Sequence, residues 1–326
     1  MKNFIGRNNP AYSLPHENLD GVSANALYLS DLSDRDKLWD KHRRNSDQVA
    51  NYYRGLEEFR KYAERIDGCA RLLDFCLVVD EIENGYRLKL YMAQFCRVKN
   101  CPTCQWRRSL MWKMKAYQVL PMIVDDYPKY RWLFLTLTVR NCLITELRQT
   151  LREMNKSWRR LNQRKKFPAI GWIRSTEVTR GEDCSAHPHF HCLLLVKPSY
   201  FGYSYIKQEA WVEMWRSCLR ADYDPVVDIR AVRRDSSPCE LIPEILKYCV
   251  KEADLVANRE WFLELTRQMY RMRTIATGGV LKDYLKQLAE EPEDLIGKDE
   301  LKTEDELDEG HLYFEWRYQE KRYKLK

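Results

Sequence analysis

The 326-residue sequence lacks any run of 18 consecutive apolar residues, so it is not expected to cross a membrane as a helix. The first seven residues also lack the apolar segment that a secretory signal requires. No internal repeat is present. These absences predict a cytoplasmic protein, and a composition with 44% hydrophobic and 32% charged residues is typical of a globular chain.

The eleven cysteines lack the features of a disulfide framework, because their number is odd, their spacing is scattered and no secretory context accompanies them. Cys96, Cys101 and Cys104 are an exception, since Cys-x4-Cys-x2-Cys spacing in a reducing compartment indicates a structural Zn²⁺ site. Cys69 is the expected fourth ligand and Cys76 is its competitor. The alternative is a group of buried thiols that bind no metal.

The net charge of +7 understates how basic most of the chain is. Residues 290–309 contain eleven acidic residues and two lysines, a net charge of −9, so the remainder carries +16. Such an excess attracts polyanions, and DNA is the expected partner. The candidate DNA contacts are Arg107 and Arg108 beside the cysteines, and Arg159 and Arg160 on a predicted basic helix. The acidic segment is either a linker that repels DNA or a segment that docks on the basic surface.

The order of the expected elements predicts an α+β fold with a central, mostly antiparallel sheet and flanking helices. In the middle of the chain, strands are expected over 132–139, 171–179, 190–196 and 226–232. Helices are expected over 143–163 and 206–220, from Pro243 to about Asn258, and over 261–287. Toward the N-terminus we expect a helical stretch over 34–65, a hairpin of 72–80 and 86–95 with its turn at 83–85, and a helix over 106–124. A last strand or docking segment is expected over 312–318.

Three of the six histidines, His187, His189 and His191, lie within five residues at the start of an apolar run. Residues two apart on a strand share a face, so these imidazoles can project together and make half of a divalent-metal site. The third ligand is expected to be Glu177, on the preceding strand, or His187 itself. A carboxylate with imidazoles suits Mg²⁺ or Mn²⁺ acting on phosphate oxygens. The alternatives are a polar strand edge or a structural zinc site.

A second group of polar residues falls on the helix predicted after Pro243. Glu244 and Tyr248 are i,i+4 neighbours there, and Lys251 follows on the same side. A nearby cation favours the phenolate, which can attack phosphorus when the phosphate charge is neutralised. By itself, however, such a helical face is usually a surface stripe of ion pairs.

The His-hydrophobe-His run at 189–191, followed by the Tyr-x-x-Lys run at 248–251, resembles the motifs of the HUH endonucleases. Residues 134–138 resemble their first motif, which forms the adjoining strand. The likeness is greatest to the rolling-circle replication initiators, or Rep proteins, of small bacterial plasmids, and it extends over residues 31–42, 95–108 and 186–196. The resemblance implies an HUH nuclease fold with an N-terminal zinc-binding region and a helical C-terminal extension.

The resemblance also implies a role for each motif residue. A Rep protein of this type nicks one strand at the plasmid origin, stays attached to the 5′ phosphate through its tyrosine, and leaves a 3′ hydroxyl that primes synthesis. Tyr248 would be the nucleophile, His189 and His191 would hold Mg²⁺ or Mn²⁺, and Lys251 would contact the phosphate. Glu244 stands where related initiators with two tyrosines carry the second, and it would activate water to end the cycle. A host helicase is a further expected partner.

The division of the chain follows from these assignments. We expect a flexible arm over 1–30, a helical and zinc-binding region over 31–126, the HUH nuclease domain over 127–258, a C-terminal helix over 259–288, an acidic linker over 289–310 and a final segment over 311–326. Two other functions stay open: a relaxase or single-strand transposase with the same chemistry, and a non-enzymatic zinc DNA-binding protein. A relaxase usually carries its tyrosine upstream of the histidines, whereas Tyr248 lies downstream of them.

Overall fold

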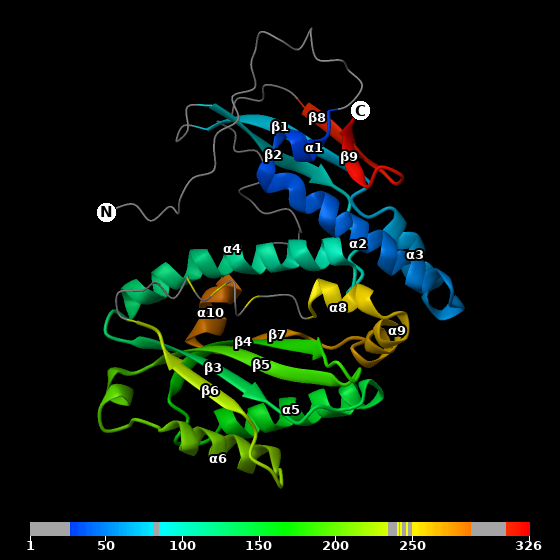
Figure 1. The fold of residues 1–326 in the computed structure, drawn as a ribbon. Helices are drawn as coiled ribbons and strands as arrows, with labels where there is room; N and C mark the ends of the chain where they lie inside the picture. The colour runs from blue at the N-terminus through cyan, green and yellow to red at the C-terminus, as the bar shows by residue number, and fades with distance from the viewer. Residues whose placement is uncertain are drawn as a thin grey trace. The chain divides into compact units, whose positions relative to one another are not determined.

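The computed structural model describes residues 27–80, 85–233, 250–287 and 311–326, together with Glu240, Ile242 and Leu246. The chain divides into two compact units, one of Met1–Cys104 with Leu295–Lys326 and one of Gln105–Asp294 (Figure 1). One antiparallel sheet has four strands and the other has five, and both units contain helices, so the predicted α+β class is confirmed. No helix among the described residues is both long enough and apolar enough to span a membrane.

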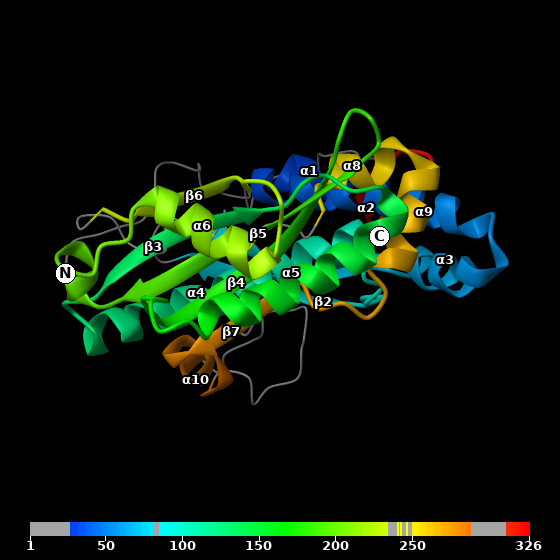
Figure 2. The same cartoon turned by 90° about the horizontal axis from the view of Figure 1, so that it is seen from below.

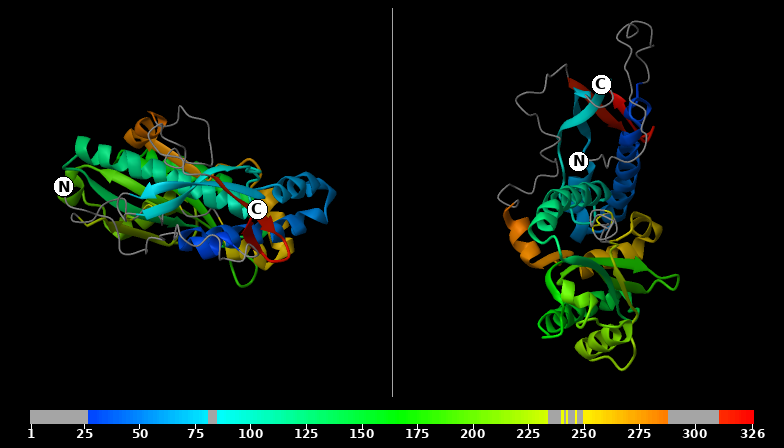
Figure 3. Two further views of the ribbon diagram at one scale, coloured as in Figure 1. Left: turned by 90° about the horizontal axis from the view of Figure 1, so that it is seen from above. Right: turned by 90° about the vertical axis from the view of Figure 1, so that its left-hand side faces the viewer.

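The first unit is built around a four-stranded sheet with the order β2-β1-β8-β9. Its strands are β1 (Leu72–Asp80), β2 (Gly85–Ala93), β8 (His311–Arg317) and β9 (Arg322–Leu325). Its helical segments are α1 (Leu29–Leu32), η1 (Asp34–Asp36), α2 (Lys37–Arg54), η2 (Glu57–Phe59) and α3 (Arg60–Asp67). Figure 3 shows the red C-terminal strands beside the cyan hairpin. The stretch expected as a strand or docking segment over 312–318 is therefore a strand of this sheet.

Aromatic side chains join the helices of the first unit to its sheet. Trp39 of α2 is buried, with its ring centroid 6.5 Å from that of Phe75 on β1 and 6.3 Å from that of Tyr323 on β9. Phe314 of β8 packs on Phe75 at 5.8 Å. Burial of side chains this large contributes about 1.5–3 kcal/mol each. The core of this unit therefore depends on residues more than 200 positions apart in the sequence.

The second unit contains a five-stranded sheet with the order β6-β3-β5-β4-β7. Its strands are β3 (Arg131–Thr138), β4 (Ala169–Arg180), β5 (Ala186–Val196), β6 (Val227–Ala231) and β7 (Ile275–Gly279). Its helical segments are η3 (Ile144–Glu146), α5 (Leu147–Asn162), η4 (Pro198–Phe201), α6 (Gln208–Leu219), α8 (Glu252–Ala257), α9 (Arg259–Gln268) and α10 (Val280–Gln287). Helix α4 (Pro102–Asp126) begins in the first unit and lies mostly in the second.

The two faces of this sheet are covered by different helices. Figures 1 and 2 show α5 and α6 next to each other on one face, with α10 and α4 on the other. On the second face, Phe134, Ile173 and Leu193 belong to one buried apolar cluster with Ile123 of α4 and Leu281 of α10. Because side chains alternate along a strand, the odd-numbered residues of β5 all face this cluster. The histidines of β5 therefore project toward the α4 and α10 side.

The single helix predicted over 261–287 is wrong, because a strand interrupts it. Helix α9 ends at Gln268, β7 pairs with β4, and α10 begins at Val280. Ile275 and Thr277 are β-branched, which disfavours a helix and favours a strand. Gly279 has a φ of +58°, and a Cβ there would collide with the carbonyl oxygen of Ile170. Strand β7 therefore ends at a position that only glycine can occupy, and α10 begins at the next residue.

The helix predicted from Pro243 to about Asn258 is interrupted at Val250 and Lys251, and its last part is the separate helix α8 (Glu252–Ala257). Val250 forms a parallel bridge with Val178 of β4, and Lys251 has extended backbone angles before α8 begins at Glu252. Val250 is fully buried, so packing of its β-branched side chain beside β4 outweighs continuation of a helix. Residues 243–245 and 247–249 lie outside the described part of the chain, as does most of the predicted hairpin turn at 83–85.

Candidate functional site

The register of the second sheet places an acidic side chain beside two of the histidines. Strand β5 lies between β3 and β4, and His189 is directly opposite Glu177 on β4. His191 is opposite Thr136 on β3. Directly opposed residues on antiparallel strands project from the same face of a sheet. Two neighbouring strands thus bring one carboxylate and two imidazoles together on the α4 and α10 side.

The three side chains meet at one carboxylate oxygen. Glu177 Oε2 lies 3.1 Å from His189 Nε2 and 2.9 Å from His191 Nε2. The two imidazole rings are perpendicular, with their centroids 4.7 Å apart. Glu177 and His191 are 5% and 8% exposed, so their ligand atoms are largely shielded from solvent. All three lie within 4.8 Å of one another, which is close enough to hold one metal ion.

The other ring nitrogens are held by groups outside the cluster. His191 Nδ1 lies 3.2 Å from Thr136 Oγ1, and His189 Nδ1 lies 3.3 Å from the carbonyl oxygen of His187. A carbonyl can only accept, so the His189 proton is assigned to Nδ1 and its Nε2 carries a lone pair when the ring is neutral. A lone pair that faces a carboxylate needs a proton or a cation between them. The donor set therefore fits a divalent metal, with the usual outer partners that orient ligating histidines.

Glu177 is in the ionised form that a metal ligand requires. Burial alone would raise the pKa of this carboxyl group, because it penalises the charged form. The contacts of Glu177 with His189 and His191 outweigh burial and lower the pKa of this carboxyl group well below its usual value. Before any metal binds, the two imidazoles thus stabilise the same negative charge that a cation would neutralise.

His187, the other candidate for third ligand, is not part of this cluster. Its Nδ1 lies 2.5 Å from Asn141 Oδ1, and its ring centroid is 5.4 Å from that of His189. Burial, and then the nearby His189, lower the pKa of His187. In the part of the chain that the structure describes, Glu177 is the third residue whose ligand atom joins those of His189 and His191.

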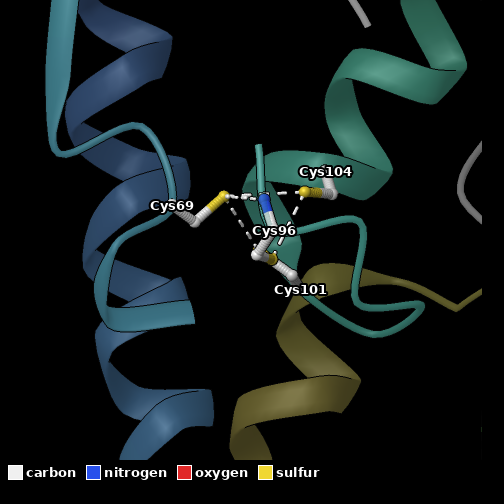
Figure 4. Close-up of side chains that lie close together, drawn as sticks. All are labelled: Cys69, Cys96, Cys101 and Cys104. Carbon is white, nitrogen blue, oxygen red and sulfur yellow. Dashed lines mark hydrogen bonds between the residues drawn. The ribbon is translucent and has the colours of Figure 1, made fainter. Parts of the chain in front are cut away.

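Four cysteine side chains form a second convergent group, in the first unit (Figure 4). Cys69 follows α3, Cys96 follows β2, and Cys101 and Cys104 lie at the start of α4. Their Sγ atoms are 3.5 Å apart for Cys69–Cys104 and Cys96–Cys104, and 3.8 Å apart for Cys69–Cys101. A tetrahedral Zn²⁺ with bonds of ~2.3 Å separates its sulfurs by about 3.8 Å, so these spacings fit zinc.

Backbone and hydroxyl groups near the cysteines favour negatively charged sulfur. The N–H of Cys96 donates to Cys69 Sγ and that of Val98 donates to Cys96 Sγ, both at 3.4 Å. Burial alone would raise the pKa of the Cys101 thiol, but hydrogen bonds from the other three cysteines and Ser46 outweigh it and hold that pKa well below its usual value. The hydrogen bonds with Cys101 in turn raise the pKa of Cys69 and of Cys96, so the negative charge is held on Cys101. Metal-binding cysteines are thiolates, so this environment suits ligation.

Cys76, the competing fourth ligand, lies elsewhere. It is on β1, where its buried thiol is 3.5 Å from the carbonyl oxygen of Lys89 on the neighbouring strand. Cys69 is the fourth cysteine of the group that could hold a metal.

Of the other predicted site residues, Glu244 and Tyr248 lie outside the described residues. Lys251 is exposed, and its carbonyl accepts hydrogen bonds from the first turn of α8. Of the predicted DNA contacts, Arg107 is buried, Arg108 is half-buried and Arg159 is exposed. Arg160 donates to the carbonyl oxygen of Cys218 and to Ser157 Oγ, so its guanidinium group serves the packing of α5 on α6.

Two residues that support the histidine strand were not predicted from the sequence. Thr136, which orients His191, could be found only from the strand register. Arg174 lies on the opposite face of the sheet, with its guanidinium carbon 3.9 Å from the ring centre of Phe190, the residue between the two histidines. Burial lowers the pKa of Arg174 to about 10, and Asn155 accepts a hydrogen bond from it. No periodicity in the sequence indicates a buried arginine at this position.

Comparisons with known proteins agree with this architecture. The sequence model of a family described as replication protein matches residues 87–324. A "Protein rep" of Streptococcus pneumoniae serotype 2 (strain D39 / NCTC 7466) is 37% identical over 262 residues, which cover 78% of this chain and 80% of the relative. A "Protein rep" of Bacillus amyloliquefaciens is 37% identical over 304 residues, which cover 83% and 87%. A "Replication protein" of Staphylococcus aureus is 33% identical over 231 residues, which cover 65% and 98%. No solved structure gives a significant match.

A match over most of the chain, at this level of identity, identifies the class of protein as a replication protein. More particularly, the chain belongs to the Rep family of plasmid proteins that initiate rolling-circle replication. The resemblance inferred from the histidine and tyrosine motifs is confirmed at this level.

Proposed function

We propose that this Rep protein is a metal-dependent nickase and strand transferase that cuts one DNA strand at the plasmid origin and stays joined to it through Tyr248. The observation that carries the proposal is the meeting of Glu177, His189 and His191 at a single carboxylate oxygen. A non-enzymatic DNA-binding protein has no need for three convergent, nearly buried ligand atoms on neighbouring strands.

Glu177, His189 and His191 would hold Mg²⁺ or Mn²⁺ through carboxylate oxygen and imidazole nitrogen. When bound, the metal would supply positive charge to the non-bridging oxygens of the scissile phosphate. The protein's own contribution is orientation. Thr136 and the His187 carbonyl hold the far sides of the two rings, so both Nε2 atoms already point toward Glu177 before metal or DNA arrives.

The positions of residues on either side of Tyr248 support its assignment as the nucleophile. Val250 pairs with Val178, the residue next to Glu177. Leu246 belongs to the buried cluster with Ile173 and Leu193, on the same sheet face as the histidines. Tyr248 is two residues before Val250 in the sequence, which supports the proposal that it acts on a phosphate held at these ligands. Lys251 follows Val250 and is exposed, where it can contact phosphate.

The proposed reaction forms one bond to phosphorus and breaks one. The Tyr248 oxygen, after losing its proton, attacks the scissile phosphorus, and the bond from phosphorus to the 3′ oxygen breaks. The leaving oxygen takes up a proton and becomes the free 3′ hydroxyl. At the end of the cycle Glu244 would accept a proton from water, and the resulting hydroxide would displace the tyrosine from the 5′ phosphate.

The test of this proposal is nicking of a supercoiled plasmid that carries the origin. His191→Ala removes one of three ligands, and we expect the rate of open-circle formation with Mn²⁺ to fall roughly a thousandfold, because several kcal/mol of transition-state stabilisation are lost. Origin binding in a gel-shift assay should stay within about twofold. His311→Ala is the matched control, since His311 also pairs with a carboxylate, Asp74, but in the first unit. Normal nicking by His191→Ala contradicts the proposed metal site.

Glu244→Ala is expected to slow the release of the DNA by water without slowing the nicking step. Nicking should continue, but release by water should slow about a hundredfold without the general base, within the range of general acid–base catalysis. Covalent protein–DNA adducts should therefore accumulate, visible as a shifted band on a denaturing gel. Glu240→Ala, an exposed glutamate four residues earlier, is the control. An equal loss of nicking and release in Glu244→Ala would contradict the termination role.

A further inference from the structure

A cleft of about 1150 Å³ lies in the second unit, away from the metal cluster. One wall is the segment that leads from α5 into β4, residues 164–170. The rest of the lining is formed by Lys197, residues 199–200 and 203–207, and α6 residues from Glu209 to Ser217. The cleft is larger than the ~300–1,000 Å³ of typical small-molecule pockets, and it is open to solvent along its length. Its size suits a segment of polymer better than a metabolite.

The residues that line this cleft carry a net positive charge, which favours an anionic ligand. Five cationic residues line it, whereas the acidic lining residues are Glu209 and Glu213. The five are Arg164, Lys165, Lys166, Lys197 and Lys207. The cations come from three separate segments of the lining, so several phosphates of one strand in the cleft could be contacted. Neutralisation of phosphates by such side chains releases counterions and is the main source of affinity for nucleic acids.

Exposed aromatic rings accompany the charges. Tyr203 is 93% exposed and Tyr205 is 60% exposed, so both rings are open to a ligand that can stack on them. Beneath them Tyr200 is buried, with its ring centroid 5.7 Å from that of Tyr205. The Tyr200 hydroxyl donates to the carbonyl oxygen of Ile206 and accepts from Trp211 Nε1. A buried ring with a hydrogen-bonded hydroxyl thus supports the ring of Tyr205.

Basic walls with exposed tyrosines match the way proteins bind single strands without reading their sequence, through phosphate contacts and stacking of bases on aromatic rings. A duplex would use the cations alone, because its bases are already stacked on one another. We propose that this cleft binds single-stranded DNA several nucleotides away from the nick site, an inference that rests on the proposed nicking function.

The position of the cleft sets the length of strand required. From His189 to Lys197 the chain runs eight residues along β5, roughly 26 Å at ~3.3 Å per residue. At the ~3.4 Å per nucleotide of a stacked strand this distance corresponds to about eight nucleotides. A strand that reaches both the metal cluster and the cleft must therefore extend at least several nucleotides from the cut, on one side of it.

The direct test is binding of a fluorescent single-stranded origin oligonucleotide to the full chain, measured by anisotropy in a His191→Ala background so that no cutting occurs. Tyr203→Ala should weaken binding about tenfold, and Tyr203→Phe, which keeps the ring, should bind as the parent does. Lys165→Ala with Lys166→Ala should reduce the slope of log K against log salt by about 0.7 for each phosphate that the variant no longer neutralises. Tyr318→Ala and Lys61→Ala, exposed residues of the first unit, are the matched controls.

A nicking assay then separates this proposal from the proposed function. With wild-type residues at the metal cluster, Tyr203→Ala should raise KM about tenfold for oligonucleotides with 20 nucleotides on the cleft side of the cut. It should leave KM unchanged for those with four. Because the cleft can bind the strand on either the 5′ or the 3′ side of the cut, oligonucleotides extended on each side are tested in turn. Absence of nicking by the parent would overturn the proposed function while the anisotropy result still stands.

Equal binding by Tyr203→Ala and its parent would overturn the cleft proposal. So would a Tyr203 effect of the same size on duplex DNA, since stacking should matter only for unpaired bases. The rival occupant is the acidic segment over 290–309. If a peptide of that sequence binds the parent tightly, loses affinity in Lys165→Ala with Lys166→Ala, and single-stranded DNA shows no such loss, the cleft serves the peptide instead.

Discussion

Replacing Tyr248 with phenylalanine is expected to abolish nicking of origin DNA, with a loss of roughly 10⁴-fold or more, because the attacking oxygen is removed. The substitution keeps the ring and removes one oxygen, so the fold of the described residues should be preserved. The rate of open-circle formation from supercoiled plasmid with Mn²⁺ measures the effect. Affinity for the origin should stay within about twofold of the parent.

Tyr270→Phe is the matched control for this substitution, since Tyr270 is a half-exposed tyrosine of the same unit. It should nick at the parent rate. If Tyr248→Phe also nicks at that rate, the phosphorus is attacked by another group, and the assignment of Tyr248 fails even where the metal site is correct. Loss of origin binding in Tyr248→Phe would instead indicate a structural role.

Replacing Cys101 with serine is expected to have the largest effect on stability. Cys101 is fully buried, and its Sγ lies 3.8 Å from that of Cys69. Serine is a poor zinc ligand, so the variant should lose Zn²⁺ and about 4 kcal/mol or more of the unfolding free energy of the first unit. That loss corresponds to a fall in Tm of more than about 10 °C. Metal content by elemental mass spectrometry and thermal unfolding by circular dichroism measure it.

Cys76→Ser is the control for the zinc prediction. Cys76 is equally buried, but its thiol is 3.5 Å from the Lys89 carbonyl oxygen, and a serine hydroxyl can donate to the same acceptor. This variant should keep its zinc and lose only about 1 kcal/mol. If Cys101→Ser retains a full equivalent of zinc and an unchanged Tm, the four cysteines are buried thiols rather than ligands.

Features set by short-range patterns could be predicted from the sequence. The alternation in 187–191 places the histidines on one face of a strand, because that periodicity is a property of the backbone. The short turn after β4 makes Glu177 a neighbour of that strand, although the choice between Glu177 and His187 needs the register of β4 against β5. Likewise the spacing of Cys96, Cys101 and Cys104 indicates a metal site, but spacing cannot rank Cys69 above Cys76.

Features that depend on packing between distant segments could not be predicted. Thr136 supports His191 only because β3 pairs with β5 in one register, which is fixed by the whole sheet. The break at Val250 arises from its bridge to Val178, 72 positions away, and local helix propensity gives no sign of it. Tertiary contacts override local preference in each case.

The central claim is that Tyr248 becomes covalently joined to the DNA that the Glu177–His189–His191 cluster helps to cleave. The most direct measurement is mass spectrometry of the proteolysed adduct formed with Mn²⁺ and a single-stranded origin oligonucleotide, using Glu244→Ala to preserve the adduct. We expect one modified peptide, which contains Tyr248 linked to the 5′ phosphate of the downstream fragment. An adduct on any other residue, or cleavage that yields only free 5′ phosphate with no adduct at all, would contradict it.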